Sequence, residues 1–331
     1  MGKQAYTNDE LLIKAAVAVA DITTTNGVGG GVLQPEQLEQ FLRITQVSQA
    51  ILREARVEIV SRGQKLLDRT GMTSRFLRPG VEDDTRLYTS AAAYLALESK
   101  PTLQSIKLQT QKMDGTSSIS WETLQRNIEK EGFADTLVEI MAERAAFDLE
   151  DFGVNGLVGS ADPLYNMRNG FLANVPAANI VDWGHTPFTT NAFVMAINSV
   201  QARFRRNISE FRFYVSHGLE MAYRYALSQR GTVGGDVWQT EDGSLKAYGV
   251  PVIGVDSMPN NLGTNQNEGV IFFAHPKNLI WAVEDEIRIL DEFNKHRDSL
   301  EIFFHASVDV AVEEVNAIAK VVNIQWTVGG S

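Results

Sequence analysis

The longest regular pattern of hydrophobic and polar positions runs from Trp121 to Gly156. Apolar residues recur there at steps close to four, which places them along one side of an α-helix. A glycine within a helix costs about 1 kcal/mol relative to alanine, so Gly132 predicts a bend or a break. The helix after Gly132 should span roughly 30 Å. The apolar positions are Leu124, Ile128, Phe133, Leu137, Met141, Ala145, Leu149 and Phe152.

The end and the polar side of this helix also follow from the pattern. Asn155 and Gly156 predict its end, because both residue types tolerate the left-handed conformation. The segment from Glu122 to Asp151 holds nine acidic and three basic residues, so its solvent side should be strongly acidic. A core helix with a solvated acidic face is the simplest interpretation. The acids on that face are Glu129, Glu131, Asp135, Glu139, Glu143, Asp148, Glu150 and Asp151.

The first third of the chain alternates between short elements and an irregular stretch. Helices are predicted over 8–20 and 31–44, with the glycine-rich linker "TTTNGVGGG" between them, and a strand over 53–61. The stretch from Arg62 to Pro101 has little to bury, which indicates a protruding loop or hairpin. Two alternating runs follow around Asp114 and Gly115, which predict a hairpin turn at that pair.

The second half of the chain mixes both periodicities. An Asn-Gly turn is predicted at 169–170, and a long buried strand is predicted over 245–260. Helices are expected over 192–206 and 219–231, with a strand over 211–218 between them. The segment 305–328 alternates, with Val308, Val310 and Val312 on one face and then Ile318, Val322, Ile324 and Trp326 on one face. These groups of strands separated by helices predict the α+β class, because they do not form a repeating βαβ pattern.

Composition excludes several functional classes. The chain of 331 residues has 30 Lys and Arg against 41 Asp and Glu, a net charge of −11, which argues against a general binder of nucleic acid or anionic membranes. The absence of cysteine excludes disulfides, thiolate catalysis and cysteine-ligated metals. The apolar run between Lys14 and Asp21 is too short for a signal-peptide core or a membrane span.

No motif predicts a catalytic, cofactor or metal site. "GVGGGV" at 27–32 follows no strand and has no lysine of a phosphate-binding loop. The histidines show no paired metal-binding spacing. Ser216 and His217 are neighbours on a predicted strand, so their side chains should point to opposite faces. The acidic runs at 82–84 and 284–286 have the pattern of solvated charge. We therefore expect no enzyme activity, although an α+β enzyme with a dispersed site remains an alternative.

An ordered set of segments resembles the major capsid proteins of tailed phages, the Hong Kong 97-type fold family, over roughly residues 27–326. "GGGVLQPEQLEQFLRI" is similar to the family's glycine-rich entry and amino-terminal helix. "LVEIMAERAAFDLEDFGVNG" resembles its long spine helix, and "DPLYNMRNGFLANV" the segment after it. "YGVPVIGVDSMPN" and "RDSLEIFFHASVDVAVEEVNAIAKVVNI" resemble the later strands.

The resemblance implies a particular division of the chain. It predicts the Hong Kong 97-type capsid fold, in which a long spine helix supports a flat subunit that tiles a shell. The implied parts are an amino-terminal arm (1–60), an extended loop (61–102), a peripheral domain with the spine helix (103–176), an axial domain (177–282), a return through the peripheral domain (283–316) and a carboxy-terminal axial strand (317–331).

The resemblance also implies function and partners. It predicts a major capsid protein that self-assembles into hexamers and pentamers and encloses double-stranded DNA without sequence-specific binding. The protein is expected in the virion, after assembly in the host cytoplasm. No cofactor and no membrane partner are expected. Only about 25 residues precede the glycines, so we expect a separate scaffolding protein or little scaffolding. A portal is a further partner that the resemblance implies. An encapsulin-type nanocompartment shell is the alternative of similar fold.

The family brings the extended loop of one subunit onto its neighbour, which suggests where the interface lies. The loop from Arg62 to Pro101 holds seven basic and five acidic residues. Its net charge is therefore positive, whereas the net charge of the helix is negative. We expect either ion pairs from the loop arginines or apolar contacts to dominate this docking. The interface residues predicted are Arg75, Phe76, Leu77, Arg78, Leu87 and Tyr88 on the loop and Asp135, Glu139 and Glu143 on the helix.

Overall fold

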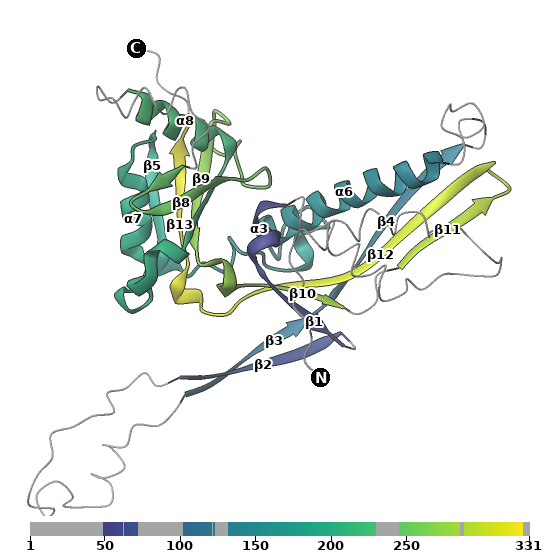
Figure 1. The fold of residues 1–331 in the computed structure, drawn as a ribbon, viewed down its shortest axis with the longest axis horizontal. Coiled ribbons are helices and arrows are strands. Elements are labelled where there is room, and N and C mark those ends of the chain that lie inside the picture. Colours follow the sequence, from purple (N-terminus) through teal and green to yellow (C-terminus); the bar gives the residue numbers. More distant parts are fainter. Residues whose placement is uncertain are drawn as a thin grey trace, which may run out of the picture.

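Two large β-sheets, each built from segments distant in the sequence, form the framework of the protein (Figure 1). Most neighbouring strands are antiparallel and helices are interspersed, which confirms the α+β class. The predicted helices over 8–20 and 31–44 and the linker between them lie outside the described residues. The helix predicted over 219–231 is α8 (His217–Ser228), which ends before Gly231. The computed structural model describes residues 49–61, 63–71, 102–120, 122, 132–229, 245–284 and 288–326.

The first sheet has five strands around the long strand β12 (Ser299–Val312). The first half of β12 pairs with β4 on one side and β11 on the other, and its second half pairs with β10. β1 extends the sheet by a parallel pairing with β10. The partner strands are β1 (Arg56–Val60), β4 (Gln111–Ser120), β10 (Leu279–Glu284) and β11 (Arg288–Asn294).

The second sheet has six strands in the order β5-β13-β9-β6-β8-β7. Helices α7 (Asn191–Ser199) and α8 (His217–Ser228) pack on it, and Phe193, Phe213 and Tyr223 form an aromatic cluster between sheet and helices. Its strands are β5 (Ile180–Pro187), β6 (Arg212–Val215), β7 (Lys246–Ala247), β8 (Val250–Gly254), β9 (Glu268–Ala274) and β13 (Ala319–Gln325).

Short helices connect these elements. The predicted helix over 192–206 is helical in two parts, because α7 ends at Ser199 and a 3-10 segment, η4, then follows. The short segments are α3 (Ala50–Glu54), η2 (Tyr165–Met167), η3 (Ala177–Asn179), η4 (Ala202–Glu210), η5 (Pro276–Asn278) and η6 (Val315–Ala317). In the described part of the chain, no helix is long and apolar enough to cross a lipid bilayer.

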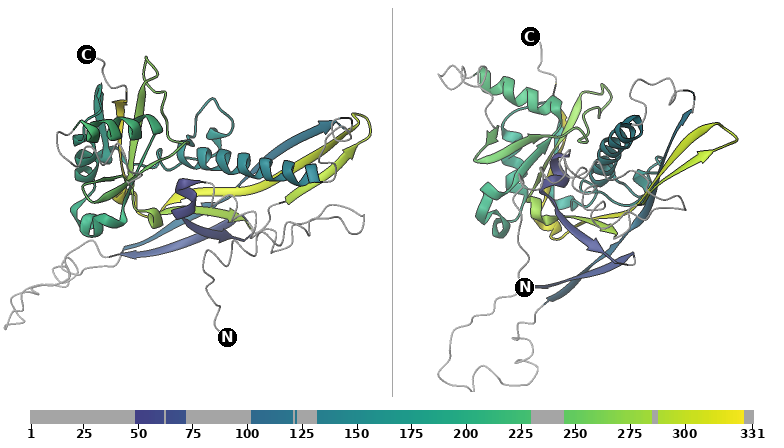
Figure 2. Two further views of the ribbon diagram at one scale, coloured as in Figure 1. Left: turned by 45° about the horizontal axis from the view of Figure 1, so that its top comes forward. Right: turned by 45° about the vertical axis from the view of Figure 1, so that its right-hand side comes forward.

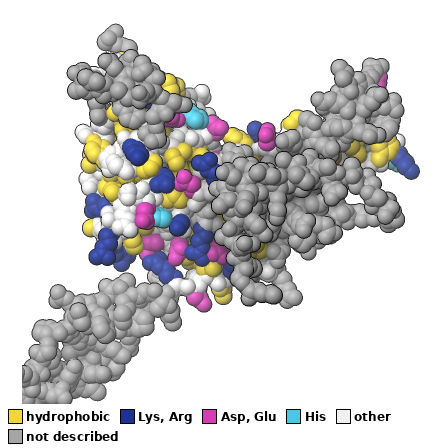
Figure 3. Space-filling view, in the orientation of Figure 1, with side chains coloured by type: hydrophobic (Ala, Val, Ile, Leu, Met, Phe, Trp, Pro, Cys, Tyr) yellow, Lys and Arg dark blue, Asp and Glu magenta, His cyan; other side chains and the backbone are white. Residues whose placement is uncertain are grey.

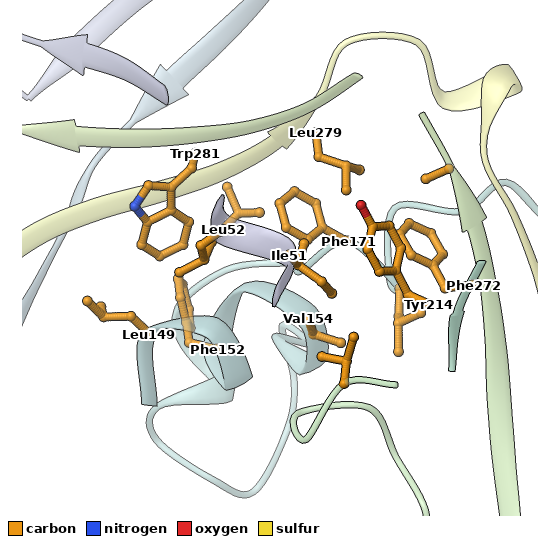
Figure 4. Packing of buried hydrophobic residues seen from close by; sticks show 14 of the residues in the cluster. Ile51, Leu52, Leu149, Phe152, Val154, Phe171, Tyr214, Phe272, Leu279 and Trp281 are labelled. Atoms are coloured by element: carbon orange, nitrogen blue, oxygen red, sulfur yellow. The ribbon is translucent and has the colours of Figure 1, made fainter. Parts of the chain in front are cut away.

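The long helix α6 (Gly132–Asn155) lies along the first sheet (Figures 1 and 2). Leu149 and Phe152 pack against Trp281 of β10 and the short helix α3 (Figure 4). The buried face also includes Ala142 and Ala146, so it is turned slightly from the predicted stripe. The break expected at Gly132 involves residues 123–131, which lie outside the described residues.

Two features of α6 differ from the prediction. Glu150, expected on the solvated acidic face, is only 1% exposed. Asn155 and Gly156 do end the helix, but neither adopts a left-handed conformation. The glycine is needed for close contact instead, because a Cβ on Gly156 would lie 2.4 Å from the carbonyl oxygen of Arg168. The amide of Gly170 donates to the carbonyl of Gly156 at 2.8 Å, so Asn169–Gly170 forms a close backbone contact rather than the predicted turn.

The hairpin predicted at Asp114–Gly115 is also wrong. Both residues lie inside β4, which runs straight along β12 with Gly115 opposite Phe304. A Cβ on Gly115 would lie 3.6 Å from the Phe304 side chain, so the glycine sits beneath this ring in the sheet. The Asp-Gly pair is a turn signal only when the two flanking runs pair with each other, whereas here β3 and β4 have different partners.

Two carboxy-terminal predictions need correction in the second sheet. The predicted strand over 245–260 is a tight hairpin of β7 and β8, whose turn residues Tyr248 and Gly249 both have positive φ. In β13 the predicted common face is interrupted, because the register shifts at Asn323, whose φ is 60°. Val322 therefore packs toward the first core and Ile324 toward the second.

The stretch from Arg62 to Pro101 begins as a protruding hairpin, as predicted. Strands β2 (Gln64–Gly71) and β3 (Thr102–Gln109) pair antiparallel over eight residues and extend away from both sheets (Figures 1 and 2). We call this element the extended hairpin. At its base, Leu108 packs with Ile280 and Ala311 in a small apolar cluster, separate from the one to which α6 contributes.

Glu150 joins α6 to the start of the described chain. Its Oε1 accepts a hydrogen bond from the amide of Ile51 at 2.7 Å, in the first turn of α3, and its Oε2 accepts one from Ser257 Oγ at 3.3 Å. Burial raises the pKa of this carboxyl above its ordinary value, although the hydrogen bonds act in the opposite direction. A raised pKa means that the folded state binds more protons than the unfolded state does, so stability falls as the pH rises above about 4.5.

We predict that Glu150→Gln removes this pH dependence. The amide keeps an acceptor for Ile51 but cannot ionise, so the variant should gain stability relative to the wild type between pH 4 and pH 7 on the order of 1 kcal/mol. Denaturant unfolding of the unassembled chain at several pH values measures the difference. Glu150→Ala serves as the control, since it leaves a buried amide unpaired and should cost about 1–3 kcal/mol throughout. A difference between wild type and Glu150→Gln that is constant with pH would contradict the prediction.

Candidate assembly surfaces

The root of the extended hairpin is tied to the body by ion pairs. Lys65 Nζ lies 2.6 Å from Glu58 Oε2, and Arg56 donates from Nε to Glu58 Oε1 at 2.7 Å. The hydrogen bond from Lys65 lowers the pKa of Glu58, and Arg56 adds to this effect. Arg56 also reaches Glu313 at 3.1 Å. The direction in which the hairpin leaves the body is therefore held by charges on β1, β2 and the end of β12.

Arg69 forms a second link, farther along β2. Its guanidinium pairs with Glu314 and donates to the carbonyl oxygen of Glu313 at 3.2 Å. Burial acts to raise the pKa of Glu314, but the hydrogen bonds from Arg69 and Asn316 outweigh it and the pKa is lowered. Two of the seven bases between Arg62 and Pro101, Lys65 and Arg69, thus pair within their own chain.

A buried carboxylate fixes the other strand of the hairpin. Asp309 is fully buried in β12 and accepts from the amide of Gln109, the last residue of β3, at 2.6 Å. Arg168 lies 2.9 Å from the same carboxylate, and the amide of Val310 donates at 2.8 Å. Burial raises the pKa of Asp309 despite these partners. Sequence reasoning missed this residue, although a single aspartate within the alternating run "SVDVAV" was a visible signal.

The helix residues predicted for the interface belong to α6. Asp135, Glu139 and Glu143 are spaced by four residues, so their positions fall on one side of the helix. Glu143 is exposed. Nearby acids are already engaged, since Asp148 pairs with Arg144 at 2.9 Å and Asp151 accepts from the Tyr165 hydroxyl at 2.5 Å. Of these two acids, only Asp148 is balanced by a charged partner, whereas Asp151 keeps its charge while accepting a hydrogen bond.

The predicted residues of the loop follow β2 in the sequence and lie outside the described residues. They are Arg75, Phe76, Leu77, Arg78, Leu87 and Tyr88. The docking of this loop on α6 of a neighbouring chain therefore stays a prediction.

Exposed apolar side chains that sequence reasoning did not select also mark surfaces suited to burial. Leu66 on the extended hairpin is 63% exposed, and Met221 on α8 is 64% exposed. Tyr225 follows Met221 by one helical turn and is also exposed. Covering such side chains with another surface is favourable by about 25 cal/mol per Å² of apolar surface buried.

The described residues hold no arrangement for catalysis or metal binding. No group of three histidine or acidic side chains is placed to ligate a metal within these residues. Ser216 is not on a strand as predicted but precedes the first turn of α8, and His217 begins that helix. The His217 ring contacts Asp256 at 2.6 Å, whereas the buried Ser216 hydroxyl has no hydrogen-bond partner. The pair therefore cannot act as a nucleophile and base.

Comparison with known proteins agrees with this architecture. The family model "Phage capsid family" matches residues 29–323. The putative prophage capsid protein YqbE of Bacillus subtilis (strain 168) is 30% identical over 322 residues, which cover 96% of this chain and 99% of that protein.

Solved structures of low sequence identity share the fold. A chain from the satellite phage P4 procapsid that includes the size determination (Sid) protein is 16% identical, with a TM-score of 0.63 over 97% of this chain and 98% of that chain. The holo-SrpI encapsulin complex of Synechococcus elongatus PCC 7942 gives a TM-score of 0.56 at 12% identity, over 100% and 99% of the two chains. The Hong Kong 97-type fold expected from the sequence is thereby confirmed.

The match over nearly the whole chain and the protruding hairpin agree with each other. This chain belongs to the phage capsid family, whose major capsid proteins form the shell of the phage head.

Proposed function

We propose that this chain assembles into the hexamers and pentamers of an icosahedral head that encloses double-stranded DNA of a tailed phage. The extended hairpin carries the proposal, because β2 and β3 pair over eight residues of each strand and carry the exposed Leu66 on a surface that a single subunit leaves uncovered. Ion pairs at its root hold it ready to meet a second subunit. Exposed apolar residues on the hairpin and on α8 support association through several faces.

We further propose the division of the chain that the resemblance implies. The six-stranded sheet begins at Ile180, which supports an axial domain from about residue 177. The chain changes sheets between β9 and β10, through Pro276–Asn278, which supports a return to the peripheral domain slightly before residue 283. β13 returns to the second sheet, as a carboxy-terminal axial strand should.

The proposed partners are copies of this chain, a separate scaffolding protein, a portal and packaged DNA. Assembly would take place in the host cytoplasm. The acidic balance of the chain suits DNA that is enclosed without sequence-specific contacts, because a protein of net charge −11 gains little from general phosphate binding.

The function is tested on particles purified from the producing cell and treated with nuclease. Negative-stain micrographs should show closed shells, and extraction should release protected double-stranded DNA. Shells that contain a protein cargo and no DNA would indicate an encapsulin-type compartment instead. A protein that remains small and soluble at all concentrations would contradict a shell function.

We propose that Arg75 and Arg78 help to dock the loop on the acidic side of α6 in a neighbour. The double variant Arg75→Glu with Arg78→Glu should leave the subunit folded by circular dichroism and lower the particle yield, most clearly at low ionic strength. Each exposed ion pair contributes only about 0–1 kcal/mol and is screened by salt, but the contact repeats at every subunit. The control is Arg75→Lys with Arg78→Lys, which keeps the charge. A normal yield across salt concentrations would favour apolar docking through Phe76, Leu77, Leu87 and Tyr88.

We also predict that the link from Arg69 to Glu313 and Glu314 sets the direction of the extended hairpin for assembly. Arg69→Met keeps most of the aliphatic stem but removes the links to Glu313 and Glu314, at a cost of about 1 kcal/mol. Amide hydrogen exchange in β2 and β3 should accelerate, and assembly should slow. Lys107→Met, which removes a charge from an exposed position on the same hairpin, is the matched control. Equal exchange and assembly in the two variants would show that the link has no such role.

A further inference from the structure

A pocket of about 440 Å³ lies where the two sheets meet, beside the outer half of β2 in the extended hairpin. We call it the junction pocket. It draws on elements far apart in the sequence, namely β2, η4, η5 and the segment around η6. Figure 3 shows basic and acidic side chains gathered toward this end of the six-stranded lobe. The residues that matter below are Arg203, Arg206 and Lys277 and the acids Glu210, Glu313 and Glu314.

The acids of the junction pocket are engaged within the chain. Glu314 pairs with Arg69, Glu313 with Arg56, and Glu210 lies 3.2 Å from the His275 ring. Glu313 and Glu314 are therefore balanced by arginines, whereas the Glu210 contact is an ion pair only when His275 is protonated. The lysine and arginine residues that line the pocket outnumber its acids, four to three.

The three bases have no such partners. Within the part of the chain that the structure describes, Arg203, Arg206 and Lys277 are exposed and form no ion pair. The Arg203 guanidinium lies over the ring of Phe204, 4.4 Å from its centroid, and this contact restricts its position. Three cations around one recess in a chain of net charge −11 form a local site for carboxylates or phosphates.

The shape and lining favour a polypeptide over DNA as the occupant. A duplex presents a convex, uniformly negative backbone, which touches raised surfaces and cannot enter a recess of this size. The junction pocket also holds acids, and it has apolar walls from Phe204, Phe211 and Ala317. A peptide segment can supply carboxylates to the bases and apolar side chains to these walls.

The location favours a second copy of the same chain. Arg69, in the outer half of β2, lines the junction pocket. In the view of Figure 1 the hairpin runs below the six-stranded lobe. A subunit that the hairpin reaches would therefore approach this side of the molecule. Each copy holds eleven more acidic than basic residues, so carboxylates are available on a neighbouring copy.

We propose that the junction pocket receives an acidic segment of a neighbouring copy in the shell, whose carboxylates pair with Arg203, Arg206 and Lys277. The inference rests on the proposed shell function. It adds a contact beside Arg69 of the hairpin, separate from the docking of the loop residues 75–88 on α6. Because the bases are exposed, the contact should weaken as salt rises.

A zero-length cross-link tests the contact directly. Subunits labelled with ¹⁴N and ¹⁵N are mixed, assembled and treated with a carbodiimide, which joins a lysine amine to a carboxylate only when the two touch. Mass spectrometry should find Lys277 joined to an Asp or Glu of a differently labelled subunit. Lys277→Arg is the matched control, since it keeps the charge and the assembly but should lose this cross-link.

Charge reversal supplies the second readout. Arg203→Glu with Arg206→Glu should leave the subunit folded by circular dichroism and reduce particle yield at least several-fold at low salt. Shells that form normally while Lys277 cross-links to no other copy, or only to a different protein, would overturn the inference and leave the shell function intact. A wild-type protein that forms no shell would overturn both.

Discussion

The buried carboxylate of Asp309 is the constraint on which the arrangement of the first sheet and the extended hairpin depends. It lies near the carboxy-terminal end of β12 and accepts hydrogen bonds from β3 and from Arg168, in the segment that follows α6. A buried charge without such partners would cost several kcal/mol, so these elements must be in place together. The direction of the hairpin is thereby coupled to the position of the chain after the long helix. Ion pairs at Lys65 and Arg69 then hold its other strand.

The buried apolar residues of the protein form several separate clusters rather than one deep core. α6 contributes to the apolar cluster on one side of the first sheet, while the base of the hairpin forms a smaller cluster with Ile280 and Ala311. A second core lies between the six-stranded sheet and its helices. Each layer is thin, so apolar side chains such as Leu66 and Met221 stay exposed in the single subunit. A flat subunit of this kind gains much of its remaining burial from neighbours, as the tile of a shell requires.

Close backbone contacts, rather than special dihedral angles, explain several glycines. Gly156 and Gly170 face each other where the chain turns back along the end of α6, and Gly153 lies against Trp281. A side chain at Gly156 would collide with main-chain atoms that cannot move aside. These close contacts hold the segment that contains Arg168. The glycines therefore help to place Arg168 beside the buried carboxylate of Asp309.

The sequence by itself determined the class of fold, the long helix, the protruding stretch after Arg62 and the alternation of β12, because each depends on a local period or on a lack of apolar residues. Ordered resemblance over most of the chain also identified the family. Only the tertiary structure decided which strands pair, and this is why the Asp114–Gly115 turn was wrong and why Glu150 is buried under α3. The same holds for Asp309 with Arg168 and for the junction pocket, whose residues come from distant segments. Local periodicity reports which side of an element is apolar, whereas partner strands, buried ion pairs and pockets depend on long-range packing that no short window contains.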